Sequence, residues 1–384
     1  MATNYRGVHL TAILSKIAEK TIAKDLMTHL HSGVFGPDQW AFTPGLSARD
    51  LVTALVMSWI LAIATGSKIG GFLGDIVGAF DKVCKDYLMA KLQAAGVGSL
   101  YLNWLDSYLQ PRKAQVVVEG VASDLFEIAN TVFQGTVLGP GLWNTFFSDV
   151  SKPASSTGGD PSKFADDLSV FQKFHRLEDN ASVRRTMHVC RERVHKWGRE
   201  NRVAFDPSKE HVVILHPIYG EGDPFKLLGC LVDSKLVMNQ AVDAILSQMR
   251  PKIAAILRTR SHYSAAELIV QFKTHIWSIM EIHNGAIFHA SDYLLEKIDH
   301  IQCSFLTELG MDEKTCFLEH NFAPPRLRRN IGVLGLLHKR VLGLSHPIFQ
   351  KILPFEQDVL GNTGRPDMHT KQLYDHILDV QYQQ

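Results

Sequence analysis

Aspartates at the ends of strand-like segments constrain the fold of this chain more than any other sequence feature. Residues 72–77, Phe-Leu-Gly-Asp-Ile-Val, predict a short buried strand with Asp75 at its end. Residues 164–171 have strand character on both sides of Asp166-Asp167, which indicates a hairpin with these aspartates at its tip. Carboxylates at strand ends are rigidly aimed, so three that converge would hold hard divalent cations through oxygen.

Helical patterns surround this acidic region. Apolar residues spaced by three and four predict a helix over 10–30, and an apolar run predicts a buried helix over 51–65. The other main elements predicted are a hairpin over 114–129, a helix over 181–200, strands over 203–215 and 225–233, and helices beyond Val237. We therefore expect an α+β protein with a helical start, a mixed centre and a helical end.

Composition and charge indicate an ordinary globular protein. The chain has 384 residues, which is long enough for two or three packed subdomains. Hydrophobic residues make up 46% and charged residues 21%, which excludes a disordered chain. The formal net charge is only +1, so any binding of nucleic acid has to rely on local groups of basic residues.

The sequence indicates an intracellular protein of the nucleus or cytoplasm. Its five cysteines are scattered and odd in number, which suits a reducing compartment without disulfides: Cys84, Cys190, Cys230, Cys303 and Cys316. No signal peptide is visible in residues 1–6. The most apolar run, 51–65, is shorter than the roughly 20 residues that cross a bilayer, so we expect no membrane partner.

Each acidic feature alone has an ordinary explanation. About one Asp-Asp pair is expected by chance in a chain of this length, and such a pair is most often a solvated turn. Asp75 alone would be interpreted as a turn residue at a strand end. An unrelated metal-dependent hydrolase could use the same acids, but the segment 134–140 would then have no purpose. The order and context of the motifs decide between these explanations.

Five central segments follow one another in the same order as motifs that occur together in one protein family. They are FLGDIVGAFDKV at 72–83, QGTVLGP at 134–140, FADD at 164–167, DPSK at 206–209, and LLG at 227–229 with Asp233. These segments resemble the palm motifs and primer-gripping hairpin of the reverse transcriptases of LINE-type (non-LTR) retrotransposons. Upstream, YRGVHLT at 5–11 and LSKIAEK at 14–20 resemble the fingers motif of the same family.

The resemblance implies a right-hand polymerase fold of the α+β class. Residues 1–66 would form the N-terminal part of the fingers, 67–235 the palm with an antiparallel sheet and inserted fingers elements, and 236–384 the helical thumb and a C-terminal extension. It implies an RNA-directed DNA polymerase, a nucleotidyltransferase that adds deoxynucleotides to a primer 3′-hydroxyl with two Mg²⁺ ions, or with Mn²⁺ instead. The expected partners are an RNA template, a DNA primer and deoxynucleoside triphosphates.

The resemblance also implies roles for the acidic residues and a lysine. The metal ligands would be Asp75, Asp166 and the backbone carbonyl of Ile76, with Asp167 completing the acidic cluster. Lys209 would donate a proton to pyrophosphate as a general acid, and a merely solvated loop lysine is the alternative.

Nucleotide contacts are expected from Arg6, Phe80, Gln134 and Gly135. Phe80 would be an aromatic gate, because its ring collides with a 2′-hydroxyl and so favours deoxynucleotides; plain core packing is the alternative. Gln134 and Gly135 would position the template and the incoming base, although a tight turn also explains the glycine. Arg6 would pair with the triphosphate through its planar guanidinium.

Two further groups lie in the C-terminal third. Arg326, Arg328, Arg329, Lys339 and Arg340 would hold the phosphates of a template–primer duplex, with a solvated helix face as the alternative. His300, Cys303, Cys316 and His320 have zinc-finger-like intervals. Because the first two of these four lie in an amphipathic helical stretch, where such residues usually pack, zinc is the minor interpretation.

The fingers loop departs from the family pattern. Residues 41–47 read AFTPGLS where the family usually has two arginines, so positive charge is lost near the expected nucleotide. Gly7 and Phe133 stand where the family has prolines. The chain begins at the fingers motif, so we interpret it as a fragment, a truncated gene product or a decaying copy. An endonuclease supplied by another chain is one candidate partner. A catalytically inactive, degenerate remnant that only binds nucleic acid is the alternative function.

Overall fold

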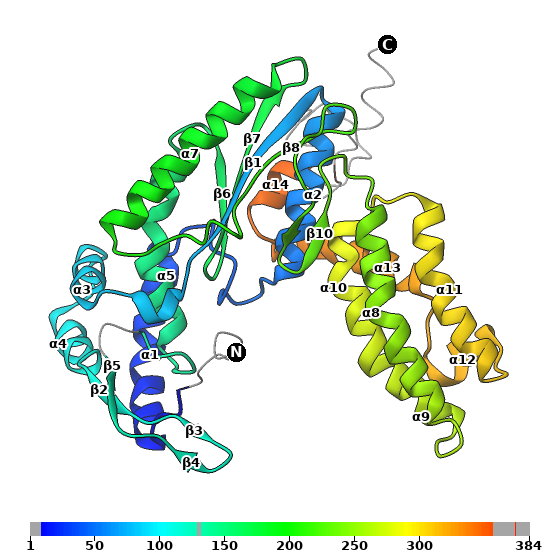
Figure 1. Cartoon of the computed structure of the whole chain (residues 1–384), viewed down its shortest axis with the longest axis horizontal. Helices are drawn as coiled ribbons and strands as arrows, with labels where there is room; N and C mark the ends of the chain where they lie inside the picture. The colour runs from blue at the N-terminus through cyan, green and yellow to red at the C-terminus, as the bar shows by residue number, and fades with distance from the viewer. Residues whose placement is uncertain (1–8, 129–131, 356–372, 374–384) are drawn as a thin grey trace, which may run out of the picture. The chain divides into compact units, whose positions relative to one another are not determined.

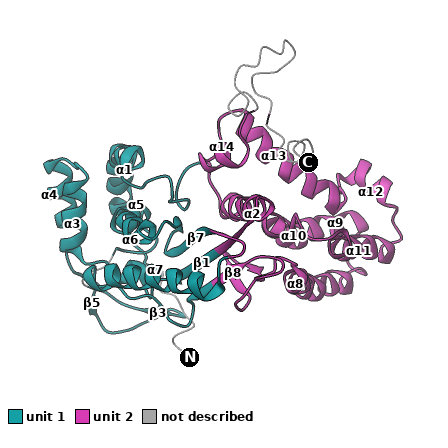
Figure 2. Ribbon diagram, turned by 90° about the horizontal axis from the view of Figure 1, so that it is seen from above, with its two compact units in different colours: residues 1–44, 70–173, 178–212 teal, residues 45–69, 174–177, 213–384 magenta. Residues whose placement is uncertain are grey.

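The computed structural model describes residues 9–128, 132–355 and 373. The chain forms two compact units and passes between them several times, so neither unit is one continuous stretch (Figure 2). Unit 1 comprises Met1–Pro44, Gly70–Lys173 and Glu178–Val212, and unit 2 comprises Gly45–Ile69, Phe174–Leu177 and Val213–Gln384.

A four-stranded sheet with the strand order β6-β7-β1-β8 carries the central motifs (Figure 1). Its strands are β1 Ser67–Asp75, β6 Asp160–Phe164, β7 Asp167–His175 and β8 His211–Leu215. β6 and β7 pair antiparallel as a hairpin. β1 is an interior strand that is buried nearly throughout, which fits the run of apolar residues and glycines at 69–74. A Cβ at Gly74 would lie 3.1 Å from a ring carbon of Phe205, so glycine allows this close packing.

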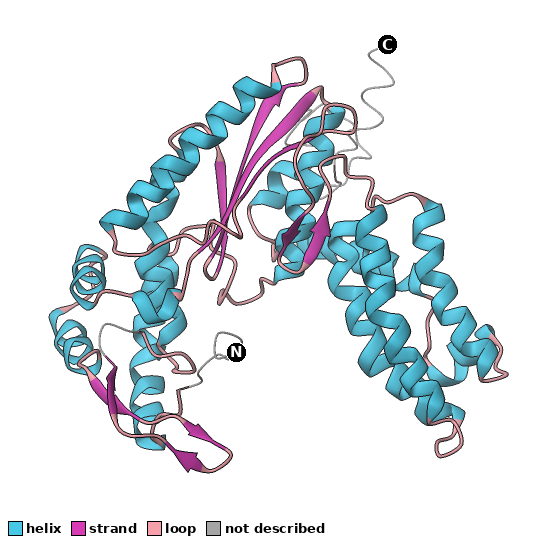
Figure 3. Ribbon diagram, in the orientation of Figure 1, coloured by secondary structure: helices cyan, strands magenta, loops and turns pink. Residues whose placement is uncertain are grey.

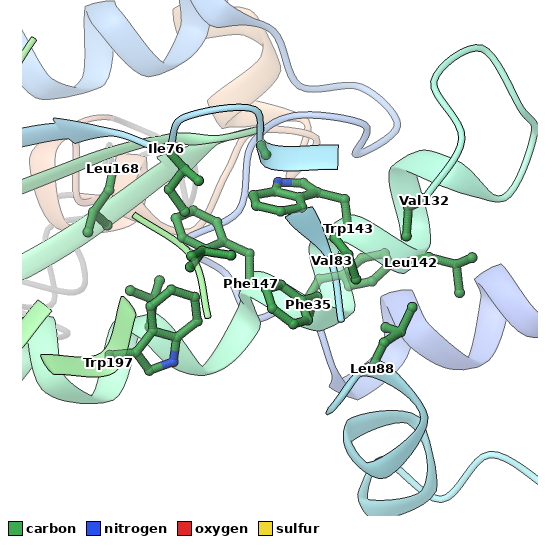
Figure 4. Packing of buried hydrophobic residues seen from close by; sticks show 14 of the residues in the cluster. Phe35, Ile76, Val83, Leu88, Val132, Leu142, Trp143, Phe147, Leu168 and Trp197 are labelled. Atoms are coloured by element: carbon green, nitrogen blue, oxygen red, sulfur yellow. The ribbon is translucent and has the colours of Figure 1, made fainter. Parts of the chain in front are cut away.

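The helices of unit 1 enclose an aromatic core. They are α1 Ile13–Gly33, α3 Lys85–Ala94, α4 Ser99–Tyr108, α5 Gly139–Phe147, α6 Ser151–Ser155 and α7 Asn180–Glu200, with 3-10 turns at Ala79–Lys82 and Ser148–Val150. Within α5, Trp143 and Phe147 stack with ring centroids 5.3 Å apart (Figure 4). α7 buries apolar residues spaced by three and four, and its Trp197 contacts Phe147 at 5.7 Å.

A double hairpin extends from unit 1 after α4. β2 Arg112–Ala114 pairs antiparallel with β5 Phe126–Ile128, and β3 Val117–Val118 pairs antiparallel with β4 Val121–Ala122. The turn between β3 and β4 is Glu119-Gly120, where both residues have positive φ. This is the backbone that two-residue hairpins favour, so the predicted hairpin through Gly120 is confirmed.

Unit 2 is almost wholly helical (Figure 3). Its elements are α2 Ala48–Ala64, the hairpin β9 Phe225–Leu227 and β10 Cys230–Val232, α8 Asn239–Arg258, α9 Ala265–Phe272, a π-helical turn Lys273–Trp277, α10 Ser278–Ile287, α11 Asp292–Glu308, α12 Glu313–His320, α13 Pro325–Val341 and α14 Ile348–Ile352. α2 packs closely on α10, because a Cβ at Gly285 would lie only 2.3 Å from Thr53 Oγ1.

The predicted α+β class, aspartate hairpin and helical end are confirmed. None of the helices among the described residues is long and apolar enough to cross a membrane, and α2 is a buried helix as expected. The strand predicted over 203–215 is wrong in its first part, since β8 begins only at His211. There the Asp206 carboxylate accepts the amide of Ser208 at 3.0 Å, and this turn stops the strand. The boundaries of fingers, palm and thumb stay predictions.

Candidate active site

Asp75 is the last residue of β1, and a short irregular ladder continues beyond it. The amide of Asp206 donates to the carbonyl of Asp75 at 2.9 Å, and the amide of Val77 donates to the carbonyl of Ala204 at 2.9 Å. These two bonds lie on either side of Ile76 and use neither its amide nor its carbonyl. The ladder therefore fixes the backbone at the end of β1 and leaves the Ile76 carbonyl out of both hydrogen bonds.

The β6–β7 hairpin places Asp166 in its turn and Asp167 at the start of β7. The antiparallel register leaves Ala165 and Asp166 as a two-residue turn. Ala165 has a φ of 57°, a left-handed conformation that is uncommon for a residue with a Cβ. Its carbonyl accepts the indole N–H of Trp143 at 3.0 Å, and its amide donates to the side chain of Gln39 at 3.3 Å. These two bonds hold the turn from both sides.

The three carboxylates form one electrostatic cluster. The pKa of Asp167 is raised to about 6, first by partial burial of its carboxyl group and then by the negative charges of Asp166 and Asp75. The positive charge of Lys209 opposes this shift. Asp166 and Asp167 are neighbours in the β6–β7 hairpin, and the ammonium of Lys209 hydrogen-bonds Asp75.

Lys209 reaches the cluster from the turn that interrupts the predicted strand. Its ammonium hydrogen-bonds the carboxylate of Asp75, and this bond is the main cause that raises the pKa of Lys209. The turn itself is held by Asp206, whose carboxylate accepts both the amide and the hydroxyl of Ser208. The ammonium is therefore protonated at neutral pH and lies next to one of the aspartates.

The donor set suits a divalent cation, although the side chains do not surround one as they stand. Among the described residues, no group of three or more His, Cys, Asp or Glu side chains is arranged to hold a metal ion. All three acids offer hard oxygen ligands. Burial is the main cause that raises the pKa of Asp167, and the negative charges of Asp166 and Asp75, which a cation would offset, add to it. A cation bound to Asp75 would compete with the ammonium of Lys209 for this carboxylate.

Phe80 lies in the 3-10 turn that follows β1. Its ring stacks on Trp143 with centroids 5.6 Å apart and an interplanar angle of 28°. Its carbonyl accepts the amide of Val132 at 2.9 Å. The side chain is half-buried, which fits both core packing and an aromatic gate, so its role stays a prediction.

The QGTVLGP segment is a tight loop that leads into α5. Gly135 has a φ of 84°, which disfavours any side chain there. The hydroxyl of Thr136 donates to the carbonyl of Phe133 at 2.7 Å and accepts the amide of Gly139 at 3.2 Å. A Cβ at Gly139 would lie 2.9 Å from the Phe133 carbonyl. The local backbone therefore explains why glycine stands at both positions. Gln134 is half-buried and Gly135 is exposed.

Sequence reasoning missed several residues that support the site. Trp143 and Gln39 hold Ala165, yet they belong to segments remote from the hairpin. Lys163 on β6 has a side chain that is only 1% exposed, and its ammonium pairs with Asp38 at 3.1 Å. No local pattern identifies such pairs, because the partners meet only in the folded chain. Trp143 had one available signal, its place in the apolar run after the QGTVLGP segment.

Two of the predicted nucleic-acid contacts are used inside unit 2. Arg328 pairs with Glu281, and its guanidinium lies 3.6 Å from the ring centroid of Trp277. Arg329 is 8% exposed and donates two hydrogen bonds to Asp299, at 2.6 and 2.8 Å. Both guanidinium groups therefore have internal partners that explain them without nucleic acid.

The other three basic residues of this group differ in how exposed they are. Arg340 is 5% exposed and donates to the carbonyl of Leu353 at 3.0 Å. Lys339 is half-buried and lies 3.5 Å from Asp50. Arg326 is exposed at the start of α13, and it is the member of the group best placed to contact an external phosphate.

The other predicted site residues are not brought together. Arg6 lies outside the described residues. His300 and Cys303 lie on α11, and Cys316 and His320 lie on α12. Cys316 is fully buried while Cys303 is exposed, and within the described part of the chain they belong to no metal-binding group. The structure thus offers zinc no support.

Comparison with known proteins now adds to the geometry. The model of the family described as reverse transcriptase (RNA-dependent DNA polymerase) matches residues 2–232. The chain is 26% identical over 289 residues to the probable RNA-directed DNA polymerase from transposon X-element of Drosophila melanogaster, covering 70% of this chain and 31% of that protein. It is 27% identical over 275 residues to the RNA-directed DNA polymerase from mobile element jockey of Drosophila melanogaster, covering 65% and 29% respectively.

The chain spans less than a third of the length of these two relatives. Among solved structures, telomerase from Candida albicans in complex with a TWJ fragment of telomeric RNA matches with a TM-score of 0.44 and 12% identity. That match covers 78% of this chain and 57% of the other.

Proposed function

Since this chain belongs to the reverse transcriptase family, we propose that it is a retrotransposon polymerase domain that adds deoxynucleotides to a primer 3′-hydroxyl on an RNA template. The observation that carries the proposal is the acidic cluster of Asp75, Asp166 and Asp167, in which each acid comes from a segment matching the family's motif order. Clusters of this kind are where charged groups are arranged for chemistry rather than for stability.

Divalent metal ions serve reverse transcriptases in general, and for this chain we propose two Mg²⁺ ions, with Mn²⁺ as a substitute. Asp75 and Asp166 would hold them together with the carbonyl of Ile76, and Asp167 would complete the negative site. Bound ions would activate the 3′-hydroxyl and stabilise the leaving pyrophosphate.

The chain's own side chains would orient the reactants and supply a proton. Lys209 is protonated beside Asp75, so its ammonium could transfer a proton to the departing pyrophosphate as a general acid. Phe80 would limit the space beneath the sugar, and its stacking on Trp143 supports a fixed ring position. Gln134 and Gly135 would contact the template and the incoming base from the loop before α5.

Partners and subdomains follow from the same proposal. The template would be RNA and the primer DNA, with Arg326 and Lys339 as the basic residues open to phosphate contact. Residues 1–66, 67–235 and 236–384 would be fingers, palm, and thumb with a C-terminal extension.

Primer extension on an RNA template tests the function. We expect the wild-type chain to extend a DNA primer with Mg²⁺, and we expect Asp166→Ala to abolish extension. Asp160→Ala is the matched control, because this exposed aspartate lies at the other end of the same hairpin. Equal extension by wild type and Asp166→Ala would refute the site, and no extension by wild type with either Mg²⁺ or Mn²⁺ would refute the function.

One observation favours an inactive nucleic-acid-binding protein as the second candidate. The fingers loop has Thr43 and Leu46 where the family usually has arginines, which removes charge expected to meet the nucleotide. Such a protein would bind primer–template in a salt-dependent way without turnover at any metal concentration. Filter binding and primer extension on the same preparation separate the two candidates.

A further inference from the structure

The backbone of the QGTVLGP loop is held by side chains from the N-terminal segment. The amide of Val137 donates to Glu19 Oε2 at 2.7 Å, and the amide of Leu138 lies 3.4 Å from the same oxygen. The amide of Gln134 donates to His9 Nδ1 at 3.2 Å. Two residues more than a hundred positions upstream thus bind three backbone amides of one short loop.

Glu19 is a fully buried carboxylate whose partners are mainly amides. It is 0% exposed, and within the described residues no lysine or arginine forms an ion pair with it. Burying an ionised carboxylate is costly unless hydrogen bonds compensate it. Here the compensation comes from the loop amides and from the hydroxyl of Ser15, which donates at 3.3 Å. The carboxylate and the loop therefore depend on each other.

Glu19 accepts the two backbone amides that immediately precede α5. α5 begins at Gly139, and its N-cap residue Leu138 provides no side-chain cap. The first amides of a helix have no partner within the helix and carry partial positive charge, which favours an anion there. Glu19 lies just before this helix start, while the amide of Gly139 itself donates to the Thr136 hydroxyl, so α1 holds the loop that leads into α5.

His9 holds the other end of the loop. Its ring packs edge-on against Phe133 with centroids 5.5 Å apart, while Nδ1 accepts the Gln134 amide. The His9 ring thus holds the backbone at Gln134. His9 and Glu19 thus bracket the loop at its two ends.

We propose that Glu19 and His9 are positioning residues that set the template-and-nucleotide loop from α1 and the segment before it. The inference rests on the proposed function, since the loop matters only where a template and a nucleotide bind. The three aspartates lie at the end of β1 and in the β6–β7 hairpin and not in the loop, so we expect the loop to act mainly on substrate binding. The proposal therefore assigns these two residues to substrate binding and not to the chemical step.

The variants Glu19→Ala and Glu19→Gln separate positioning from general stability. Alanine leaves the loop amides without an acceptor, whereas glutamine keeps one carbonyl oxygen that can accept both. Val194→Ala is the matched control, because this residue is equally buried in unit 1 but lies on α7. His9→Asn, which retains an acceptor, and His9→Leu, which does not, form the corresponding pair for the other end.

Two measurements decide the outcome. Hydrogen exchange of the peptide 134–147, without substrate, should speed up in Glu19→Ala, change little in Glu19→Gln and stay at the wild-type rate in Val194→Ala. In primer extension, Glu19→Ala should raise KM for deoxynucleotides about tenfold while kcat changes less than about threefold, and glutamine should restore most of the affinity. His9→Leu should also raise KM for deoxynucleotides, and His9→Asn should leave it near the wild-type value.

Each result supports or overturns one part of the proposal on Glu19 and His9. Unchanged exchange in Glu19→Ala would overturn the bracing of the loop. Faster exchange with an unchanged KM, or a loss that appears in kcat instead, would overturn the positioning role. An equal rise in KM for Val194→Ala would assign the effect to stability and also overturn it. Faster exchange in Glu19→Ala, together with no primer extension by the wild type, would refute the proposed function while leaving the bracing of the loop established.

Discussion

The ammonium of Lys209 hydrogen-bonds the carboxylate of Asp75, and so joins the DPSK turn to the end of β1. The two residues are far apart in sequence, and the short ladder between 75–77 and 204–206 brings them together. A positive charge is thereby placed inside the acidic cluster, where it opposes the rise in the pKa of Asp167.

The first prediction concerns Lys209 as a proton donor. Lys209→Ala should lower the rate of nucleotide addition at saturating substrate about a hundredfold, because general acid catalysis contributes on that order. Primer–template affinity, measured by fluorescence anisotropy, should stay unchanged. Lys152→Ala, which removes an exposed lysine of α6, serves as the control. A rate within a factor of two of wild type would show that Lys209 is only a partner of Asp75.

The second prediction concerns the pH dependence of stability at Asp167. Its folded pKa of about 6 exceeds the ordinary aspartate value of 3.8, so the ionised carboxylate is less stable in the folded chain than in the unfolded one. This destabilisation is absent below pH 3.8, grows as pH rises toward 6 and is complete above 6. Asp167→Asn should therefore stabilise the protein at pH 7.5 by about 1 kcal/mol, a value reduced for solvent exposure.

Thermal unfolding at pH 7.5 and pH 4 checks this expectation, with Asp160→Asn as the control from the same hairpin. The higher melting temperature of Asp167→Asn should be seen at pH 7.5 and nearly vanish at pH 4. A gain of equal size at both pH values would mean that charge at Asp167 is not its cause.

The third prediction concerns the turn that carries Asp166. Trp143→Phe keeps an aromatic ring but removes the indole N–H that bonds the Ala165 carbonyl. Unfolding in urea should show a loss of about 1–3 kcal/mol, because a half-buried acceptor loses its partner and a small cavity forms. Trp104→Phe is the control, since the Trp104 indole stacks on Tyr108 and forms no hydrogen bond within the described residues. Similar losses in both variants would argue against the importance of the Ala165 bond.

The fourth prediction separates structural arginines from phosphate contacts. Arg329→Ala should lower stability by about 3 kcal/mol, because Asp299 would lose both hydrogen bonds of a nearly buried pair. Arg326→Ala should leave stability unchanged but weaken nucleic-acid binding and lower its logarithmic salt dependence by about 1. Urea unfolding and binding titrations at several salt concentrations test both. Unchanged binding and salt dependence in Arg326→Ala would remove it from the interface.

The fifth prediction concerns the proposed gate. Phe80→Val should increase ribonucleotide incorporation relative to deoxynucleotide incorporation about ten- to a hundredfold, since a smaller side chain admits the 2′-hydroxyl. Single-nucleotide incorporation assays with both substrates measure the ratio. If the ratio stays constant, Phe80 is a packing residue whose role is to stack on Trp143.

Local patterns were sufficient for the main elements and for the acidic residues. Apolar spacing predicted α7 and the helical end, because a buried helix face repeats every three to four residues. The strands around Asp166-Asp167 predicted the hairpin, since its register needs only local pairing. The strand over 203–215 failed because the Asp206–Ser208 turn competes with extended backbone, and a pattern of apolar residues does not register that competition.

The C-terminal arginines show a second limit of prediction from sequence. Their spacing on α13 resembles a phosphate-binding face, and the sequence allowed an exposed helix surface as the alternative. Arg329 and Arg340 are instead nearly buried, and Arg328 pairs with Glu281. A charge count cannot predict this result, because an arginine is buried only when a matching acceptor lies within reach in three dimensions.

The sequence by itself therefore determined which acids this protein presents and on which kinds of element they lie. Strand and turn preferences act over a few residues, and the motifs retain their order along the chain. Only the tertiary structure decided what surrounds those acids. It set Lys209 against Asp75, Trp143 beneath Phe80, and Glu19 under the QGTVLGP loop. Each of these contacts joins segments distant in sequence, and its energy comes from burial and hydrogen bonding that exist only once the chain has folded.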